Sequence, residues 1–215
     1  MKNIKTILWA VSLSSLLFSC KKDDVSAPTV TLIGNDVVTI SLHQAYTEEG
    51  ATANDTKDGN VSSSVKISGT PDVNNAGVYT VTYEASDKAG NTGSATRTVI
   101  VRHTGATIAG SYAVKDSCGS SSTTYVEIVS ETNLTRLSVT RFANYDNGTA
   151  YFDLSGQTNS TITVPQQTVV CGSIPVARVF TGSGTISSDG KKLIINYTEV
   201  TNNTTTSCTG IYTKP

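Results

Sequence analysis

The chain of 215 residues is poor in the residues that most catalytic and metal sites need. It has two histidines, His43 and His103, and both lie far in sequence from every cysteine, which argues against a zinc site. The sequence places no serine or cysteine nucleophile near either histidine, so no His-dependent catalytic triad is expected. We therefore predict a protein that is not an enzyme and that uses no cofactor.

Charge and long apolar runs are also scarce. Charged residues make up 15% of the chain and the formal net charge is −1, so no basic field exists to attract nucleic acid. After the first 20 residues, no apolar run approaches the roughly 20 residues of a membrane-spanning helix. The only tryptophan, Trp9, would be lost with an N-terminal signal, which weakens the case for glycan binding by ring stacking.

What the chain does contain favours strands and turns. Its 17 glycines and its abundance of threonine, serine and valine are typical of all-β proteins. After an N-terminal signal about 195 residues remain, enough for one large or two small domains. We predict an all-β protein whose two domains divide near residue 103.

The N-terminus, residues 1–19, is predicted to be a lipoprotein signal peptide. Two lysines and a short apolar run over residues 7–17 precede Leu17-Phe18-Ser19-Cys20, which resembles a lipobox. The apolar run is too short to cross about 30 Å of hydrocarbon as a helix. An ordinary secretory signal and a short transmembrane anchor are the alternatives. A mature chain beginning at a lipidated Cys20 would be held to the outer membrane by its acyl chains.

The predicted tether, residues 20–26, carries a second signal. Lys22, Asp23 and Asp24 follow Lys21 in a run that resembles the export signal by which Bacteroidota lipoproteins reach the outer leaflet of the outer membrane. That resemblance implies exposure on the cell surface. A solvated charged tether is the alternative interpretation of the same composition.

Residues 27–102 read as short strands separated by turns. In the clearest strand, residues 78–85, tyrosine, valine and alanine alternate with threonine and glutamate, which puts one face in a core and the other in water. This half-buried pattern is typical of a β-sandwich. The other predicted strands are 29–33, 37–42, 50–53, 65–68 and 96–102.

Four blocks of this segment closely resemble the bacterial Ig-like domain first noted in a pesticidal crystal protein and common in surface lipoproteins. In order, they are residues 46–53 (YTEEGATA), 57–60 (KDGN), 76–83 (AGVYTVTY) and 86–91 (SDKAGN). The resemblance covers essentially all of residues 27–102. It implies a spacer or adhesive module with no activity of its own.

Acidic residues in the loops of this segment have two interpretations. Asp55, Asp58 and Asp87, with Asn60, could supply oxygen ligands to Ca²⁺. The same residues also suit tight turns, because an Asp side chain can cap a neighbouring amide. No complete Ca²⁺ loop with a terminal bidentate glutamate is present, so we favour turns and predict no metal.

Residues 104–215 read as a second all-β unit with eight short strands. Hairpin-length links suggest an antiparallel meander, which can remove its edges by closing into a barrel. Asn147-Gly148 and Asp189-Gly190 predict type I′ hairpin turns. The predicted strands are 108–116, 124–130, 134–142, 149–154, 160–165, 176–182, 191–198 and 207–213.

This half is similar to the small lipocalin-like domains of Bacteroidota lipoproteins. The similarity rests on residues 108–112 (IAGSY), 181–190 (TGSGTISSDG) and 208–212. The Gly-x-Trp motif of true lipocalins is missing, and Tyr112 stands where the tryptophan would be. The resemblance implies an eight-stranded barrel and leaves its ligand unspecified.

Three cysteines remain after Cys20, and an oxidising exterior favours one disulfide. If the first and last strands of the meander are antiparallel neighbours, Cys118 opposes Cys208 and Val114 opposes Tyr212. This register predicts a Cys118–Cys208 disulfide and a free Cys171. Sequence alone leaves all three pairings open.

Aromatic residues around one hairpin are the candidate ligand contacts. Phe142, Tyr145, Tyr151 and Phe152 could line a barrel mouth, and an ordinary barrel core is the favoured alternative. Carboxylates for glycoside hydrolysis could lie among Glu127, Glu131, Asp146, Asp153 and Glu199, but we interpret these as solvated strand faces and turns.

Two functional hypotheses follow. In the first, the protein is a surface lipoprotein accessory to nutrient uptake, whose Ig-like domain lifts the barrel toward a substrate or a TonB-dependent transporter. In the second, it is a structural or adhesive protein that binds another protein through loops or strand edges.

The lipoprotein interpretation makes a direct prediction. Cys20→Ala removes the thiol that would carry the acyl chains, so the variant should leave the membrane fraction while the wild type stays there. Membrane fractionation followed by mass spectrometry of the N-terminal peptide measures this. A variant that remains membrane-bound, beside an unprocessed wild-type N-terminus, would contradict the signal assignment.

Overall fold

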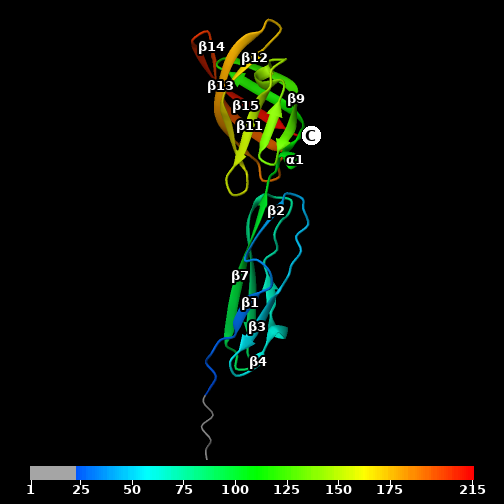
Figure 1. The fold of residues 1–215 in the computed structure, drawn as a ribbon, viewed down its shortest axis with the longest axis vertical. Coiled ribbons are helices and arrows are strands. Elements are labelled where there is room, and N and C mark those ends of the chain that lie inside the picture. The colour runs from blue at the N-terminus through cyan, green and yellow to red at the C-terminus, as the bar shows by residue number, and fades with distance from the viewer. Residues whose placement is uncertain (1–22) are drawn as a thin grey trace, which may run out of the picture.

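The computed structural model describes residues 23–215, which form two all-β domains stacked end to end (Figure 1). The signal peptide predicted over residues 1–19, the lipidation site Cys20 and Lys22 lie outside the described residues. Asp23 is exposed, and the carbonyl of Asp24 accepts a hydrogen bond from the Asn91 side chain at 3.0 Å. Among residues 23–215, no helix is long and apolar enough to cross a bilayer.

The first domain is a β-sandwich, as the alternating pattern predicts. One sheet has the order β1-β3-β4 and the other the order β2-β7-β6-β5, with β2 parallel to β7. The elements are β1 (Thr29–Leu32), β2 (Val37–Ser41), β3 (Ala51–Asp55), β4 (Gly59–Asn60), the 3₁₀ turn η1 (Ser62–Ser64), β5 (Lys66–Ser68), β6 (Gly77–Ser86) and β7 (Thr92–Arg102).

A buried arginine stands in the sandwich core beside its apolar residues. Arg97 is 0% exposed, and its guanidinium carbon lies 5.4 Å from the centre of the Tyr83 ring. It donates hydrogen bonds to the Glu48 carboxylate at 2.8 Å and to the carbonyls of Asn35, at 2.9 Å, and Ile33. A buried guanidinium is tolerable only when its donors are matched in this way.

The second domain is a closed eight-stranded antiparallel barrel with the order β10-β11-β12-β13-β14-β15-β8-β9. A short helix, α1 (Gly105–Ile108), precedes it and packs against β9. The remaining elements are β8 (Gly110–Cys118), β9 (Ser121–Asn133), β10 (Arg136–Val139), the 3₁₀ turn η2 (Phe142–Asn144), β11 (Ala150–Ser155), β12 (Thr161–Cys171), β13 (Val176–Ile186), β14 (Lys192–Thr201) and β15 (Thr204–Thr213).

The first and last strands close the barrel in the predicted register. Cys208 lies opposite Cys118 and Tyr212 lies opposite Val114, and the two cysteines form a disulfide. Cys171 is a free, buried thiol at the end of β12. The predicted pairing is therefore present in the structure.

The two predicted type I′ turns are wrong in detail. That turn type needs positive φ at both central residues. In the first turn Asn147 has a positive φ (66°) and Gly148 does not, and in the second Gly190 has a positive φ (73°) and Asp189 does not. Gly148 is required for space instead, because a Cβ there would lie 2.4 Å from Val169 Cγ1.

The junction between the domains is packed and hydrogen-bonded. The amide of Ala76 donates to the carbonyl of Ser188 at 2.7 Å, and the Asn159 side chain donates to the carbonyl of His103 at 2.8 Å. The His103 side chain is 0% exposed. Burial lowers the pKa of His103 to about 4, and the nearby Asp189 charge offsets this only in part. The junction therefore holds a neutral imidazole.

This buried imidazole predicts a specific acid sensitivity. An unfolded His103 takes up a proton below about pH 6.5, whereas the folded one resists until about pH 4, so the free energy of unfolding should fall across that window. The loss is on the order of 3 kcal/mol for a fully buried group. Urea unfolding from pH 7 to pH 4 measures it. His103→Gln should flatten the pH dependence, and His43→Gln, at an exposed ring, should not. Parallel wild-type and His103→Gln curves would contradict the assignment.

The disulfide predicts a second stability difference. It closes a loop with a sequence separation of 90, so Cys118→Ser should lower the stability of the barrel by roughly 4 kcal/mol. Cys171→Ser should cost about 1 kcal/mol, because the new hydroxyl would be buried at a site that held a thiol. Denaturant unfolding of each variant checks both values. An unreduced crosslinked peptide that contains Cys171 would contradict the pairing.

Candidate functional site

The end of the barrel that faces away from the Ig-like domain is the candidate site. The turns near residues 156–160 and 187–191 face the first domain, through hydrogen bonds from His103 to Thr158 and from Ala76 to Ser188. Because neighbouring strands are antiparallel, the turns after β8, β12 and β14 lie at the opposite end. We call this the distal end; it lies at the top of Figure 1.

The barrel wall is incomplete near the distal end. β10 pairs only with residues 129–133 of β9, and β11 pairs only with residues 161–163 of β12. Residues 121–128 of β9 therefore have a strand partner on one side only, namely β8. The chain between β10 and β11, residues 140–149, passes between these strands, and we call it the plug.

Phe142 and Glu127 make two of the contacts that hold the plug to the barrel. Phe142 packs against Phe180 and Tyr197, with ring centres 5.0 Å and 4.6 Å away. The buried Glu127 accepts hydrogen bonds from the amides of Thr140, at 3.3 Å, and Arg141, at 2.9 Å. Burial raises the pKa of Glu127 and these amides oppose the rise. The Glu127 side chain therefore accepts hydrogen bonds from plug amides at a place where β9 has no neighbouring strand on the side away from β8.

The plug has positive φ at three residues that are not glycine: Asn147 and, at its sharpest turn, the adjacent Ala143 and Asn144. Ala143 and Asn144 both have positive φ, 57° and 61°. The left-handed conformation costs roughly 1–2 kcal/mol for an ordinary residue such as alanine. Non-glycine residues in this conformation concentrate at ligand clamps and other functional sites. The plug therefore carries backbone strain beside the distal end of the barrel.

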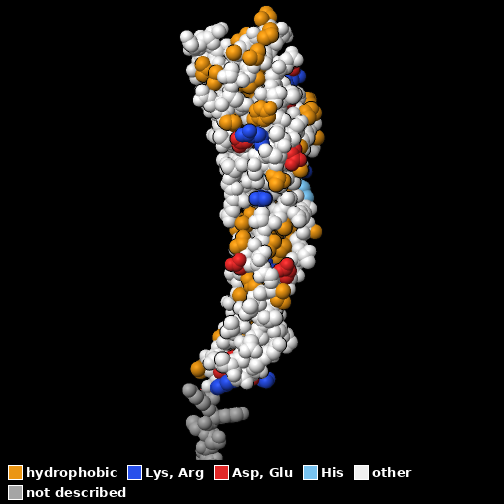
Figure 2. All heavy atoms as spheres, viewed as in Figure 1, with side chains coloured by type: hydrophobic (Ala, Val, Ile, Leu, Met, Phe, Trp, Pro, Cys, Tyr) orange, Lys and Arg blue, Asp and Glu red, His pale blue; other side chains and the backbone are white. Residues whose placement is uncertain are grey.

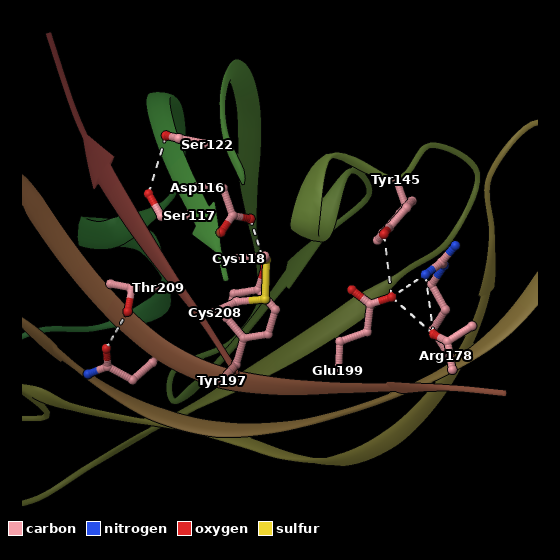
Figure 3. Close-up of a disulfide and its surroundings, with 12 residues drawn as sticks. Asp116, Ser117, Cys118, Ser122, Tyr145, Arg178, Tyr197, Glu199, Cys208 and Thr209 are labelled. Atoms are coloured by element: carbon pink, nitrogen blue, oxygen red, sulfur yellow. Dashed lines mark hydrogen bonds and ion pairs between the residues drawn. A yellow bond between two sulfur atoms is a disulfide. The ribbon is translucent and has the colours of Figure 1, made fainter. Parts of the chain in front are cut away.

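Tyr145 attaches the plug to a buried ion pair (Figure 3). Its ring centre lies 3.8 Å from the guanidinium carbon of Arg178, and its hydroxyl donates to Glu199 Oε1 at 3.4 Å. Arg178 also donates to Glu199 and, at 3.2 Å, to Thr201. Burial and the Glu199 charge raise the pKa of Tyr145. The arginine and the glutamate are thereby committed to each other.

A second buried carboxylate, Asp116, lacks such a partner. It is 3% exposed, and its Oδ2 accepts hydrogen bonds from the hydroxyls of Tyr197, at 2.7 Å, and Tyr125, at 3.4 Å. Its Oδ1 is buried and has no hydrogen-bond partner. Burial raises the pKa of Asp116; the tyrosine hydroxyls oppose the rise and the Glu199 charge adds to it.

Asp116 lines a recess of about 230 Å³ between the end of β8, the start of β9 and the plug. The recess contains no lysine, arginine or histidine side chain in its wall. Its wall combines one carboxylate, three hydroxyl side chains, one amide and one phenol ring. The lining residues are Asp116, Cys118, Ser121, Ser122, Thr123, Ala143, Asn144 and Tyr145. We call it the distal recess.

The four aromatic residues predicted as ligand contacts lie in three different environments. Tyr145 lines the distal recess. Phe142 and Phe152 are buried in the barrel core and do not line the recess, which corrects their assignment as ligand contacts. Tyr151 is exposed on the outer face, with its ring centre 5.8 Å from the Arg136 guanidinium carbon. The alternation of a strand explains the split on β11, where successive side chains point to opposite faces.

Sequence reasoning missed the carboxylates of the interior. Glu127 and Glu199 are buried, not solvated as expected, and Asp116 was not a candidate. The signal was present in the alternation: Tyr112, Val114 and Asp116 occupy the same inward face of β8. Asp146 and Asp153, by contrast, lie in the partly exposed ion pairs with Arg141 and Arg136.

The acidic residues of the Ig-like domain serve turns, as favoured. Asp55 Oδ1 accepts hydrogen bonds from the amides of Lys57 and Asp58, and Asp87 accepts from the amide and side chain of Asn91. Ligand atoms of Asp24, Asp55 and Asp58 lie within 4.8 Å of one another, whereas Asp87 lies outside this group.

Solved structures that are similar to the chain include the following three. A lipoprotein from Bacteroides thetaiotaomicron is 18% identical, with 86% of this chain and 98% of that chain covered and a TM-score of 0.35. The CBM51-2 module in complex with GlcNAc and INT domains, from Clostridium perfringens ZmpB, is 14% identical, with 86% and 44% covered and a TM-score of 0.30. The M60 catalytic domain with CBM51-1 and CBM51-2, from the same protein, is 16% identical, with 87% and 21% covered and a TM-score of 0.31.

Similarity at these TM-scores has no bearing on function. No curated protein matches the chain. The match with a protein family is confined to the first domain, where residues 30–101 fit the model described as "Bacterial surface protein, Ig-like domain". The first domain of this chain is therefore an Ig-like domain of the bacterial surface protein type, as its four sequence blocks predicted.

Proposed function

We propose that this protein is a non-catalytic lipoprotein of the outer membrane surface that acts as an accessory binding protein for nutrient uptake. Cys20 would carry the lipid, the Ig-like domain would serve as spacer, and the barrel would bind a substrate or a TonB-dependent transporter. The observation that carries the proposal is the placement of the distal recess, at the end of the molecule opposite the tether (Figure 1).

Two further observations support a binding role for that end. The packed junction around His103 joins the domains, so the Ig-like domain can hold the barrel away from the membrane. The surface carries few charged side chains on the face seen in Figure 2. A neutral surface does not attract nucleic acid, which leaves specific contacts at the recess and the turns to select a partner.

A second candidate function rests on the free edge of β9. Residues 121–128 have a strand partner only in β8, and Val126 and Ile128 on this strand are 60% and 55% exposed. They border an open groove of about 590 Å³ whose other wall is formed by the plug. A free edge beside apolar side chains suits β-strand addition by a protein partner. This function is adhesive or structural.

Site-specific photo-crosslinking on intact cells tests the two functions against each other. A photoreactive residue at Asn203, in the distal turn after β14, should crosslink to a TonB-dependent transporter, and one at Lys66, on the Ig-like domain, should not. A strain that lacks the protein should also take up the transporter's substrate more slowly.

Crosslinks that arise only from Thr124, on the free β9 edge, and that capture a protein other than a transporter would favour the adhesive function. Absence of any transporter crosslink from Asn203, together with normal uptake in the deletion strain, would overturn the nutrient-uptake proposal.

A further inference from the structure

One carboxylate oxygen of Asp116, a residue of the distal recess, has no hydrogen-bond donor within residues 23–215. Asp116 Oδ1 is buried without a hydrogen-bond donor, although Oδ2 of the same carboxylate is bound by two tyrosine hydroxyls. An unmatched buried acceptor costs about 1–3 kcal/mol, and more when it is charged. The two tyrosine hydroxyls hold the carboxylate in place, and its other oxygen has no hydrogen-bond donor among the described residues.

No basic side chain in the recess wall is placed to pair with Asp116. Among the residues that line the recess there is no lysine, arginine or histidine. Arg178, whose guanidinium contacts the ring of Tyr145, donates from Nη1 to Glu199 and Thr201; its Nε has no hydrogen-bond partner in the described part of the chain, and the residue does not line the recess. The charge of Glu199 adds to the negative field around Asp116. The site is therefore suited to a cation that also donates hydrogen bonds.

The other polar groups of the wall indicate which kind of cation the recess would accept. Asn144 Oδ1 is a second buried acceptor without a donor. The hydroxyls of Ser121 and Thr123 stand on β9, and Thr123 lies directly opposite Asp116 in the ladder. A primary ammonium offers three donors to such a set, whereas a quaternary ammonium offers none. The recess, at about 230 Å³, is smaller than the sites that take drug-sized ligands.

We propose that the distal recess binds the primary ammonium group of a small amine, or of an amine-bearing side chain or terminus, against Asp116 Oδ1. This inference rests on the proposed function, because it names the class of ligand that the distal end would recognise. The ammonium donates to Asp116 Oδ1 and Asn144 Oδ1, with the β9 hydroxyls at the rim. Tyr145 forms the wall on the side of the plug.

The experiment is a titration of the mature Cys20→Ala chain with ethylammonium chloride, followed by amide chemical shifts. Saturable shifts should appear at residues 116–123 and 143–145, with a dissociation constant of about 1–10 mM. Ethanol, which lacks the charge, and tetramethylammonium, which lacks the donors, should each bind at least about tenfold more weakly. Nα-acetyl-lysine amide, whose only ammonium is on the side chain, and glycine amide, whose only ammonium is at the terminus, distinguish a side-chain ammonium from a terminal one.

Three variants separate binding at the recess from general attraction of cations. Asp116→Asn removes the charge with little change in shape and should weaken ethylammonium binding at least about tenfold. Asp153→Asn removes one negative charge from the outer face, where Arg136 pairs with it, and should leave binding unchanged. Thr123→Lys places an ammonium opposite Asp116 and should abolish binding of the added amine. This variant keeps the test valid if Asp116→Asn does not fold.

Three results would overturn the proposal: no saturable shifts in the wild type, equal binding of ethanol, or undiminished binding by both the Asp116→Asn and Thr123→Lys variants. Because these measurements use purified protein and a simple amine, they are independent of the crosslinking experiment. A recess that binds ethylammonium in a protein that crosslinks no transporter would leave this inference standing and remove the nutrient-uptake role.

Discussion

The pairing of β15 with β8 is the interaction on which the barrel depends. It joins the last strand to the first, and without it both would be free sheet edges open to other chains. The register that it fixes also determines which β8 side chains point inward, because a shift of one residue would turn every side chain to the other face. Asp116 faces the interior for this reason, two residues after Val114, which lies opposite Tyr212.

The interior of the barrel changes character along its axis. Near the junction it is filled by apolar side chains such as Ile108, Leu137 and Leu193, all fully buried. Toward the distal end, Asp116, Glu199 and their tyrosine and arginine partners join the apolar side chains of the core. Buried ionic groups of this kind add little net stability compared with well-packed apolar residues.

Much of the architecture could be predicted from local patterns. Strand alternation and turn residues gave both domains, and the antiparallel register gave the cysteine pairing. The plug could not be predicted from local patterns. β10 and β11 are too short to reach the distal end of the barrel, and tertiary contacts of Phe142 and Glu127 hold the plug in the gap that they leave. Neither of these contacts has a signal in the neighbouring sequence.

The same limit applies to the buried polar residues. Arg97 and Glu199 look like solvent-facing charges when only their sequence neighbours are considered, and their partners come from distant parts of the chain. For the candidate site, alternation alone could have identified Asp116 as an inward residue. Its unmatched oxygen depends on the positions of Tyr125 and Tyr197, which only the folded barrel fixes.

The packed junction has a mechanical consequence. With the Ala76 amide bonded to the Ser188 carbonyl and the His103 carbonyl bonded to the Asn159 side chain, the two domains resist bending relative to each other. On the proposed lipid anchor, such a stiff body would hold its tip at a nearly constant distance from the point of attachment. The tip would then meet a neighbouring membrane protein within a restricted range of heights, and its effective concentration there would exceed that of a flexible chain of equal length.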